Sequence, residues 1–177
     1  MTKQPYHREN LAAAIQQRAR QELEELGVDQ LSLRRLAKFL AVTPAAIYRH
    51  FPDKASLLTV LRTDILTEVE AALRTGVLDS PAPDAMLSRL ITNLLGYQQD
   101  HPRAVAFGLT QPWPVPQSLT TVLTLWGAQT PVPEPLAPEQ VAAVWTFLLG
   151  VLVQPPATYS TDWVQQQVTQ LLSATTG

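Results

Sequence analysis

Hydrophobic residues recur every three or four positions along most of this chain, which is the spacing of amphipathic α-helices. We find no convincing segment that alternates hydrophobic and polar residues, as a half-buried strand would. The stripes predict about nine helices, the first from about Arg8 to Leu26 and the last from about Thr161 to Ser173. We therefore expect an all-α fold.

Capping residues separate the first helices from one another. Gly27 follows the first stripe, at the position where a glycine closes many helices. Ser32 can cap a second helix, whose inward face comprises Leu33, Leu36, Ala37 and Leu40. Three cationic side chains fall on the opposite face of that helix, namely Arg34, Arg35 and Lys38.

The third predicted helix is short. Thr43 can cap it, and Pro44 suits its first position, where the missing N–H is harmless. It ends by Phe51, because Pro52 restricts the residue before it. Ile47 and Phe51 share one face and are expected to pack inward. That leaves four side chains pointing away from the core: Ala45, Ala46, Tyr48 and Arg49.

Asp53 can cap a fourth helix, which runs from Lys54 to about Arg74. Beyond it the segment from Asp79 to Pro83 breaks the pattern, and ten of the fifteen prolines lie between Pro102 and Pro156. Three of them, Pro131, Pro133 and Pro135, predict an extended connection. Further helices are expected around residues 87–95, 104–109, 117–126 and 138–153.

The segment from Val141 to Val153 is apolar on almost every side, so a helix there must be covered on two sides. One side can meet its own domain and the other a partner subunit. We predict a four-helix dimer interface, two helices from each subunit, although a wholly internal helix in a monomer is the alternative. The interface residues are expected to be Val141, Val144, Leu148, Val151, Leu152, Val164, Val168 and Leu171.

Charge is unevenly distributed along the chain. Residues 1–62 hold ten Lys or Arg against six Asp or Glu, whereas residues 63–177 hold three against nine. A protein that binds nucleic acid with one end concentrates positive charge there. An ordinary charged surface is the alternative, because the excess is modest.

Composition narrows the class of protein further. Hydrophobic residues make up 46% of the chain, enough for a core, and there is no cysteine for disulfides or thiolate metal sites. The N-terminus lacks the apolar core of a signal peptide, and the longest apolar run is too short to span a bilayer. These features predict a cytoplasmic protein that does not enter membranes.

Several polar groups around the third helix suit DNA. Small alanines allow close approach to bases, and Tyr48 and Arg49 can bond to phosphates or base edges. The exposed backbone amides at the N-terminus of the third helix, next to Thr43 and Pro44, can hold a phosphate oxygen. Lys54 can hold another phosphate oxygen at the start of the long fourth helix. His50 is expected to be structural or a phosphate donor at the helix end.

Residues 8–58 resemble the DNA-binding domain of TetR-family repressors. The matching residues are Gly27 after the first helix, Leu36-Ala37, Val42-Thr43, Ile47-Tyr48-Arg49-His50-Phe51, and Lys54 followed by Leu57-Leu58. Ala41 departs from the glycine usual at the turn. The resemblance implies a DNA-binding domain over residues 1–53, with a regulatory and dimerisation domain over residues 54–177. It also implies a homodimer that binds double-stranded DNA at a palindromic operator.

By this resemblance Tyr48 and Lys54 are phosphate contacts, and Thr43 to Ala46 form the end that faces the groove. The full predicted DNA-binding set is Ser32, Arg34, Arg35, Lys38, Thr43, Pro44, Ala45, Ala46, Tyr48, Arg49, His50 and Lys54. Trp145 and Gly150 are similar to a subset of the family with a late Trp-His-Gly signature, although Leu149 stands before the glycine here.

Large aromatic side chains stand among the otherwise aliphatic later helices. They can line a pocket for an apolar or aromatic effector, although aromatics at helical spacing are more often plain core. The expected pocket residues are Leu94, Tyr97, Phe107, Trp113, Trp126, Trp145 and Phe147.

An enzyme is not expected. The glycines form no phosphate-binding loop, and the three histidines are isolated from metal-ligand or triad partners, so we expect neither cofactor nor metal. A helical adaptor that docks another protein is the alternative from a different class. A regulator that activates, or that has no small-molecule effector, is a second alternative.

Overall fold

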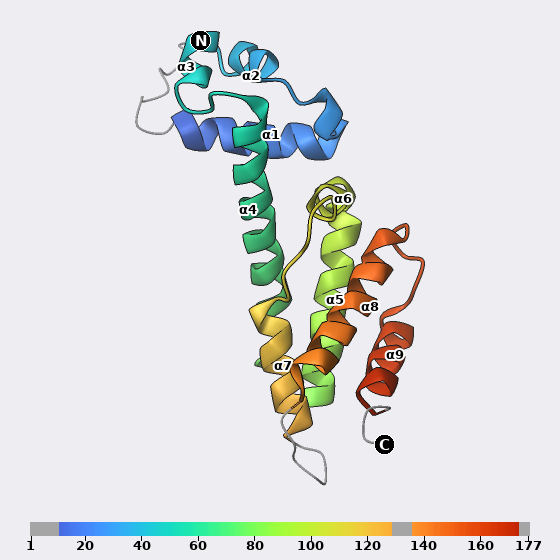
Figure 1. The fold of residues 1–177 in the computed structure, drawn as a ribbon. Coiled ribbons are helices and arrows are strands. Elements are labelled where there is room, and N and C mark those ends of the chain that lie inside the picture. Colours follow the sequence, from blue (N-terminus) through green and yellow to red (C-terminus); the bar gives the residue numbers. More distant parts are fainter. Residues whose placement is uncertain (1–10, 129–135, 174–177) are drawn as a thin grey trace. The chain divides into compact units, whose positions relative to one another are not determined.

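The computed structural model describes residues 11–128 and 136–173, which form nine α-helices and one short 3-10 helix (Figure 1). The elements are α1 (Leu11–Leu26), η2 (Val28–Gln30), α2 (Leu33–Phe39), α3 (Pro44–Tyr48), α4 (Lys54–Arg74), α5 (Pro83–Asp100), α6 (Pro102–Gly108), α7 (Gln117–Gly127), α8 (Pro138–Val153) and α9 (Thr161–Ser173). The prediction of an all-α fold with about nine helices is confirmed. The expected extended connection at Pro131, Pro133 and Pro135 lies outside the described residues.

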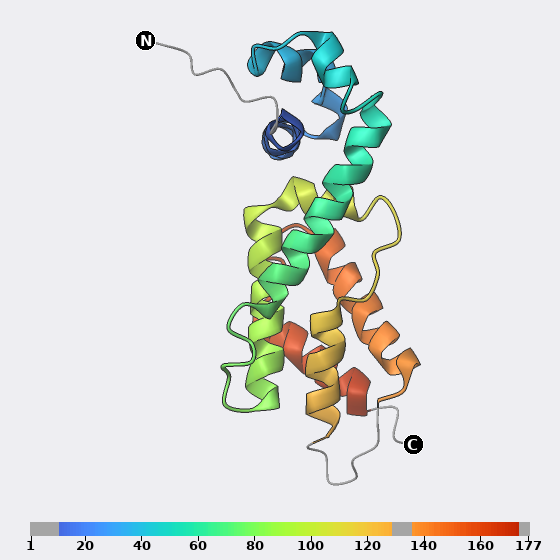
Figure 2. The same ribbon diagram turned by 90° about the vertical axis from the view of Figure 1, so that its left-hand side faces the viewer.

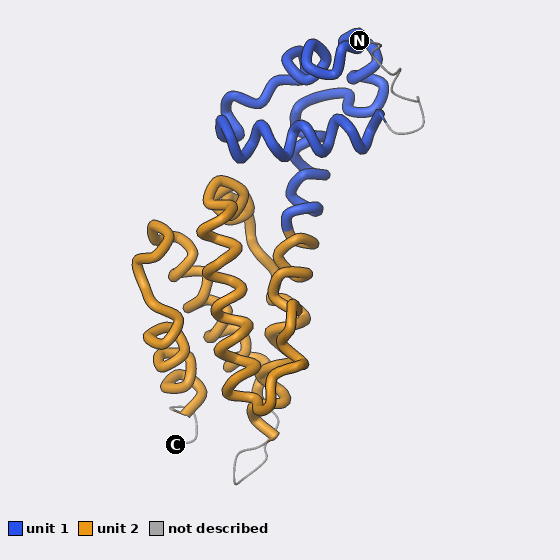
Figure 3. Tube along the Cα trace, turned by 180° about the vertical axis from the view of Figure 1, so that it is seen from behind, with its two compact units in different colours: residues 1–65 blue, residues 66–177 orange. Residues whose placement is uncertain are grey.

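In both ribbon views α4 is one continuous helix (Figure 1 and Figure 2). The chain divides into two compact units inside this helix, residues 1–65 as unit 1 and residues 66–177 as unit 2 (Figure 3). The sequence suggested a boundary after residue 53, at the start of α4. No described helix is both long and apolar enough to traverse a bilayer.

Unit 1 is built around a small apolar core. The inward stripe of α1 supplies Ile15 and Leu23, α2 supplies Leu36 and α3 supplies Ile47; all four are fully buried. Phe51, just beyond α3, is 5% exposed and closes the same core. The inward positions predicted for Ile47 and Phe51 are therefore confirmed, and they fix α3 against its neighbour α2.

The caps of unit 1 follow the sequence with one exception. Gly27 has a φ of 85°, in the left-handed region that favours glycine, and its amide donates to the Leu23 carbonyl at 2.9 Å. The Ser56 amide donates to Asp53 Oδ1 at 2.7 Å, as expected of an N-cap. Ser32 is at the N-cap position of α2, but its side chain makes no capping hydrogen bond.

A charged pair that the sequence did not reveal lies inside unit 1. Glu22 of α1 is fully buried, and the Arg18 Nε is 3.4 Å from its carboxylate. The Arg18 guanidinium also lies 3.9 Å from the centre of the Phe39 ring, on α2. The buried carboxylate is thus compensated by a cation that is itself held on an aromatic face.

In unit 2, α5 packs against α7 and α9, and α8 packs against α9 (Figure 2). Four residues of α5 at helical spacing are central to the core: Leu87, Leu90, Ile91 and Leu94. Trp113 and Trp145 meet edge to face with their ring centres 6.3 Å apart. Gly108 completes this contact, because a Cβ added there would lie 2.8 Å from the Trp113 ring.

Most residues predicted for the dimer interface are part of this core, so that prediction is wrong in detail. Six of them are at most 5% exposed: Val144, Leu148, Val151, Leu152, Val164 and Val168. Only Val141, half-buried, and Leu171, 38% exposed, reach the surface. The reason is that α8 is apolar on nearly every side, so sequence alone does not tell which side packs on its own unit.

Candidate nucleic-acid interface

The turn between α2 and α3 sets the direction of the candidate recognition helix. The Val42 amide donates to the Ala37 carbonyl at 3.0 Å, and the Ala41 amide to the Lys38 carbonyl at 3.3 Å. This pair of bonds is the Schellman closure of a helix, which puts the residue after the cap in a left-handed conformation. Ala41 accordingly has a φ of 55°. The departure from glycine therefore leaves the turn intact.

Thr43 caps α3 as predicted, because its Oγ1 accepts the Ala46 amide at 3.3 Å. Pro44 has no amide hydrogen, and the Ala46 amide is already bonded to Thr43. The N-terminus of α3 therefore offers less to an external phosphate than the sequence suggested. The helix has only five residues and ends at Tyr48 rather than near Phe51.

The outer side of α3 carries Ala45 and Tyr48, and Arg49 and His50 follow just beyond its end; all four are exposed, Tyr48 to 42%. Ala46 does not belong to this group: it is 8% exposed and packs with the core. The prediction that Ala46 points outward is wrong, because it lies beside the inward-facing Ile47 on a helix that packs closely on α2.

The three cationic residues of α2 are exposed, as predicted. The Arg35 guanidinium donates to the Gln30 carbonyl at 2.7 Å, whereas Arg34 and Lys38 form no ion pair within the described residues. Glutamates of α1 are instead engaged with Arg18 and Arg20 on the same helix. The positive charge of α2 is therefore not neutralised by the acidic residues of α1.

Lys54 is the first residue of α4 and is half-buried. Its ammonium donates to the Asp29 carbonyl at 3.4 Å, next to the carbonyl that holds Arg35. An ammonium has three donors, so this single bond leaves capacity for a phosphate oxygen. The structure thus brings cations of α2, α3 and the start of α4 into one small unit.

The aromatic residues predicted to line an effector pocket have other partners. The Trp145 Nε1 donates to the Trp113 carbonyl at 2.9 Å, and the Tyr97 hydroxyl donates to Glu68 at 2.7 Å. The Trp126 Nε1 donates to Asp84 at 2.7 Å, and the ring centres of Phe147 and Trp163 are 6.1 Å apart. Leu94 is buried in the core of unit 2, and Phe107 is half-buried on α6.

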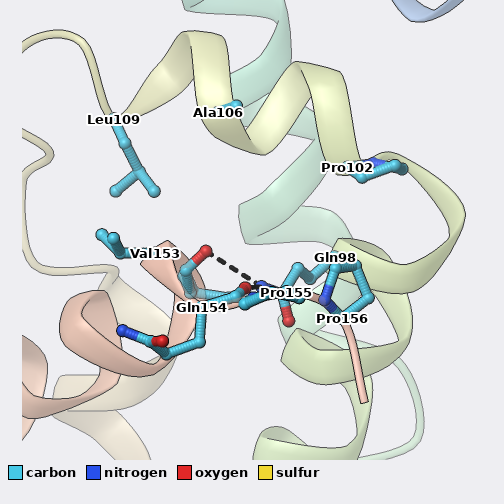
Figure 4. A pocket seen from close by; sticks show the side chains of 9 residues that line it. Gln98, Pro102, Ala106, Leu109, Val153, Gln154, Pro155 and Pro156 are labelled. Atoms are coloured by element: carbon cyan, nitrogen blue, oxygen red, sulfur yellow. Dashed lines mark hydrogen bonds between the residues drawn. The ribbon is translucent and has the colours of Figure 1, made fainter. Parts of the chain in front are cut away.

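Two of the pockets formed by described residues lie within unit 2, and none of those seven residues lines either of these two. One, of about 400 Å³, lies between α6 and the end of α8 (Figure 4). Ala106 and Leu109 face Val153 and Gln154 across it. The Gln98 side chain is 4% exposed and donates to the Leu152 and Gln154 carbonyls at 2.9 Å, which leaves this pocket largely apolar.

The outer side of α8 consists mostly of small residues. Ala142, Ala143, Thr146 and Gly150 are exposed there, and Val153 is 68% exposed. On α9, Trp163 and Leu171 are 39% and 38% exposed. We name these seven residues the outer α8–α9 face.

Residues 15–61 match the family model of bacterial regulatory proteins of the tetR family. No curated protein matches the chain. Several solved structures share its fold along nearly the whole length.

A TetR family transcriptional regulator from Agrobacterium tumefaciens is 20% identical, with a TM-score of 0.65 over 95% of this chain and 98% of that one. The TetR family regulator PfmR from Thermus thermophilus is 18% identical, with a TM-score of 0.62 over 90% and 97%. BioQ, solved with its double-stranded DNA operator, is 22% identical, with a TM-score of 0.63 over 96% and 99%.

Proposed function

Because this chain belongs to the tetR family of bacterial regulatory proteins, we propose that it is a repressor that binds a palindromic operator as a homodimer and releases it when a small effector binds. The observation that carries this proposal is the exposed positive charge of unit 1. Arg34, Lys38 and Arg49 have no ion-pair partner within the described residues, next to a capped helix that exposes Tyr48. BioQ, which shares this fold, was solved with its double-stranded DNA operator, and this supports a DNA-binding role for this chain.

Each group has a distinct role in this proposal. Tyr48 and Lys54 contact phosphates and fix the position of α3, while Ala45 and Arg49 meet base edges in the major groove. Arg34, Arg35 and Lys38 add phosphate contacts from α2. Thr43 and Pro44 shape the end of α3, and Ser32 lies at the start of α2 within reach of the same backbone. His50 adds a donor beyond the end of α3.

A dimer is proposed because α3 has only five residues and reads few base pairs alone. Two copies related by a twofold axis would place two such helices about 34 Å apart, in successive major grooves. The surface we assign to the dimer is the outer α8–α9 face, in place of the buried residues that the sequence suggested. Its small residues allow two copies of α8 to approach closely, and Trp163 and Leu171 add apolar area.

Binding to DNA supplies the test of this function. We expect fragments selected from random DNA to contain a palindrome, with an affinity that falls steeply as salt rises. Lys54→Ala should weaken operator binding about tenfold or more, because a hydrogen bond to a charged group contributes roughly 1.5–3 kcal/mol. It should also reduce the salt slope by about one. Tyr48→Ala should weaken binding across sequences in the same way.

Arg89→Ala serves as the matched control, because Arg89 is an exposed cation of α5 in unit 2. It should leave operator affinity unchanged. Affinity for DNA that does not depend on salt would refute the proposal and favour a helical adaptor. Normal operator affinity in Lys54→Ala and Tyr48→Ala would refute the roles given to those two residues.

A further inference from the structure

Two cations of unit 1 are anchored on neighbouring carbonyls of η2, although they come from different helices. The Arg35 guanidinium of α2 donates to the Gln30 carbonyl at 2.7 Å. The Lys54 ammonium of α4 donates to the Asp29 carbonyl at 3.4 Å. Consecutive Cα atoms are only about 3.8 Å apart, so the two anchors are close together. η2 therefore brings a guanidinium and an ammonium to one place.

The backbone of η2 makes these two carbonyls available. Gly27, with its left-handed φ of 85°, lies between the end of α1 and η2. The Val28 carbonyl then closes the short turn by accepting the Leu31 amide at 3.3 Å. The carbonyls of Asp29 and Gln30, which come next, accept side-chain donors. The anchors thus belong to a backbone segment that is itself closed by a hydrogen bond.

The anchors hold the two cations without neutralising them. A carbonyl carries no net charge, and neither Arg35 nor Lys54 forms an ion pair within the described residues. The glutamates at the end of α1 are engaged by arginines of α1 itself. Asp29 is an acidic residue of η2, but its exposed side chain forms no ion pair in that part of the chain either. Both positive charges therefore stay available to an anion.

The two side chains also keep donors for a ligand. An ammonium and a guanidinium each carry several N–H donors, and the anchor uses a single bond of each side chain. Arg35 is exposed and Lys54 is half-buried, so solvent reaches both. A phosphate suits this pair, because its oxygens accept two parallel bonds from a guanidinium and a further one from an ammonium. The phosphodiester of DNA is the oxyanion that the proposed function supplies.

Anchoring favours binding in two ways. Lysine and arginine lose much rotamer freedom when they are ordered, and a side chain that is already held on a carbonyl loses less of it when a ligand arrives. Two positive charges held close together also repel one another in the free protein, and an anion that contacts both of them relieves this repulsion. The second effect couples Arg35 to Lys54, since it exists only when both cations are present.

We propose that Arg35 and Lys54 form one phosphate clamp, in which η2 holds both cations on the same backbone phosphate of the operator. This inference rests on the proposed function, and it joins Arg35 to Lys54 instead of giving it a separate contact. Arg34 and Lys38 are exposed on the same helix without such an anchor among the described residues. They are expected to act independently of Lys54.

A double-mutant cycle on the full chain tests the clamp, with an operator duplex selected from random DNA. Arg35→Ala and Lys54→Ala should each weaken binding about tenfold or more. The loss in the double variant should be at least about threefold smaller than the product of the two single losses, whereas independent contacts multiply to within about twofold. Arg35→Gln and Lys54→Gln, which keep the length of an extended side chain, repeat the cycle if an alanine variant melts at a lower temperature.

The matched control combines Lys38→Ala with Lys54→Ala, because Lys38 is an exposed cation of the same helix. Their losses should multiply. Losses of Arg35→Ala and Lys54→Ala that multiply, or a double loss that exceeds the product, would overturn the clamp. Equal coupling in the control pair would also overturn it, because the coupling would then not depend on the anchors.

Methylphosphonate substitution locates the phosphate, because it removes the charge of one phosphodiester at a time. Among the positions where it weakens binding of the unmodified protein, one should lose its sensitivity in both Arg35→Ala and Lys54→Ala, and keep it in Arg34→Ala. Loss of sensitivity at two different positions would overturn the clamp while the regulator stands. Absence of salt-dependent binding to any duplex would overturn the proposed function and the clamp together.

Discussion

Among single residues, Ala41 has the least favourable backbone conformation for its type in unit 1. Its φ of 55° puts the Cβ close to a carbonyl oxygen, which is why glycine dominates the left-handed position of a helix closure. The closure holds because two hydrogen bonds, from Ala41 and Val42, fix the turn. The turn thus has the left-handed conformation for which the family uses glycine, although the residue here is alanine.

Ala41→Gly should raise the free energy of unfolding by about 1 kcal/mol. It removes the strain of an alanine in the left-handed conformation, and this gain exceeds the cost of the greater conformational entropy of glycine in the unfolded chain. Chemical denaturation measures the change. Ala71→Gly is the matched control: it is exposed inside α4, so it should instead lower stability by about 1 kcal/mol. Destabilisation by both variants would contradict the assignment of strain to Ala41.

The predicted pocket aromatics show what a sequence conveys about single side chains. It predicted that Trp113, Trp145 and Tyr97 line an effector pocket, with plain core as the alternative, and the structure buries all three in the core of unit 2. It did not indicate their partners, because the carbonyl that Trp145 bonds and the carboxylate that Tyr97 bonds are distant in the chain.

At the scale of elements, the helix caps were the feature that the sequence predicted most directly. Thr43 and Asp53 both accept an amide of the helix they precede. Such local bonds depend on residues three apart and can be read directly from the chain. The exception, Ser32, has the right residue type, but its side chain makes no capping bond.

Asp53→Ala should lower the free energy of unfolding by about 1 kcal/mol, because it removes the 2.7 Å bond to the Ser56 amide at the start of α4. Thermal or urea denaturation measures this. Asp79→Ala removes an exposed aspartate outside the helices and should change stability by less than about 0.5 kcal/mol. Equal effects of the two substitutions would show that the cap contributes nothing particular.

At the scale of the whole molecule, α8 illustrates a choice that the sequence leaves open. Its apolar residues surround the helix, and the sequence predicted cover on two sides, one from its own domain and the other from a partner subunit. The packing of unit 2 buries the side with Val144, Leu148 and Val151 and leaves the side with Thr146 and Gly150 exposed. The larger side chains thus belong to the core, and the smaller ones to the surface.

Thr146→Arg tests the assembly. A cation in the middle of the outer α8–α9 face should shift the protein toward monomers at micromolar concentration, because a charge buried there would have no partner. Operator affinity should fall about a hundredfold or more, since the two half-sites would no longer be bound by linked subunits. Sedimentation and DNA titration measure the two effects.

Thr124→Arg is the matched control for assembly. Thr124 is exposed on α7 and, like Thr146, its hydroxyl donates to the backbone carbonyl one turn earlier, at 2.8 Å. This variant should keep both the dimer and the affinity for DNA. A dimer that persists in Thr146→Arg would place the interface elsewhere.

The sequence by itself determined the helices, their caps and the exposed cations of α2, because helical periodicity, capping bonds and solvation of charge act over a few neighbouring residues. The tertiary structure alone decided which side of α8 is covered, that Ala46 faces inward, and that Arg35 and Lys54 are anchored together on η2. Those outcomes depend on contacts between residues far apart in the chain. Which side of a helix is buried is decided only when all the helices pack together.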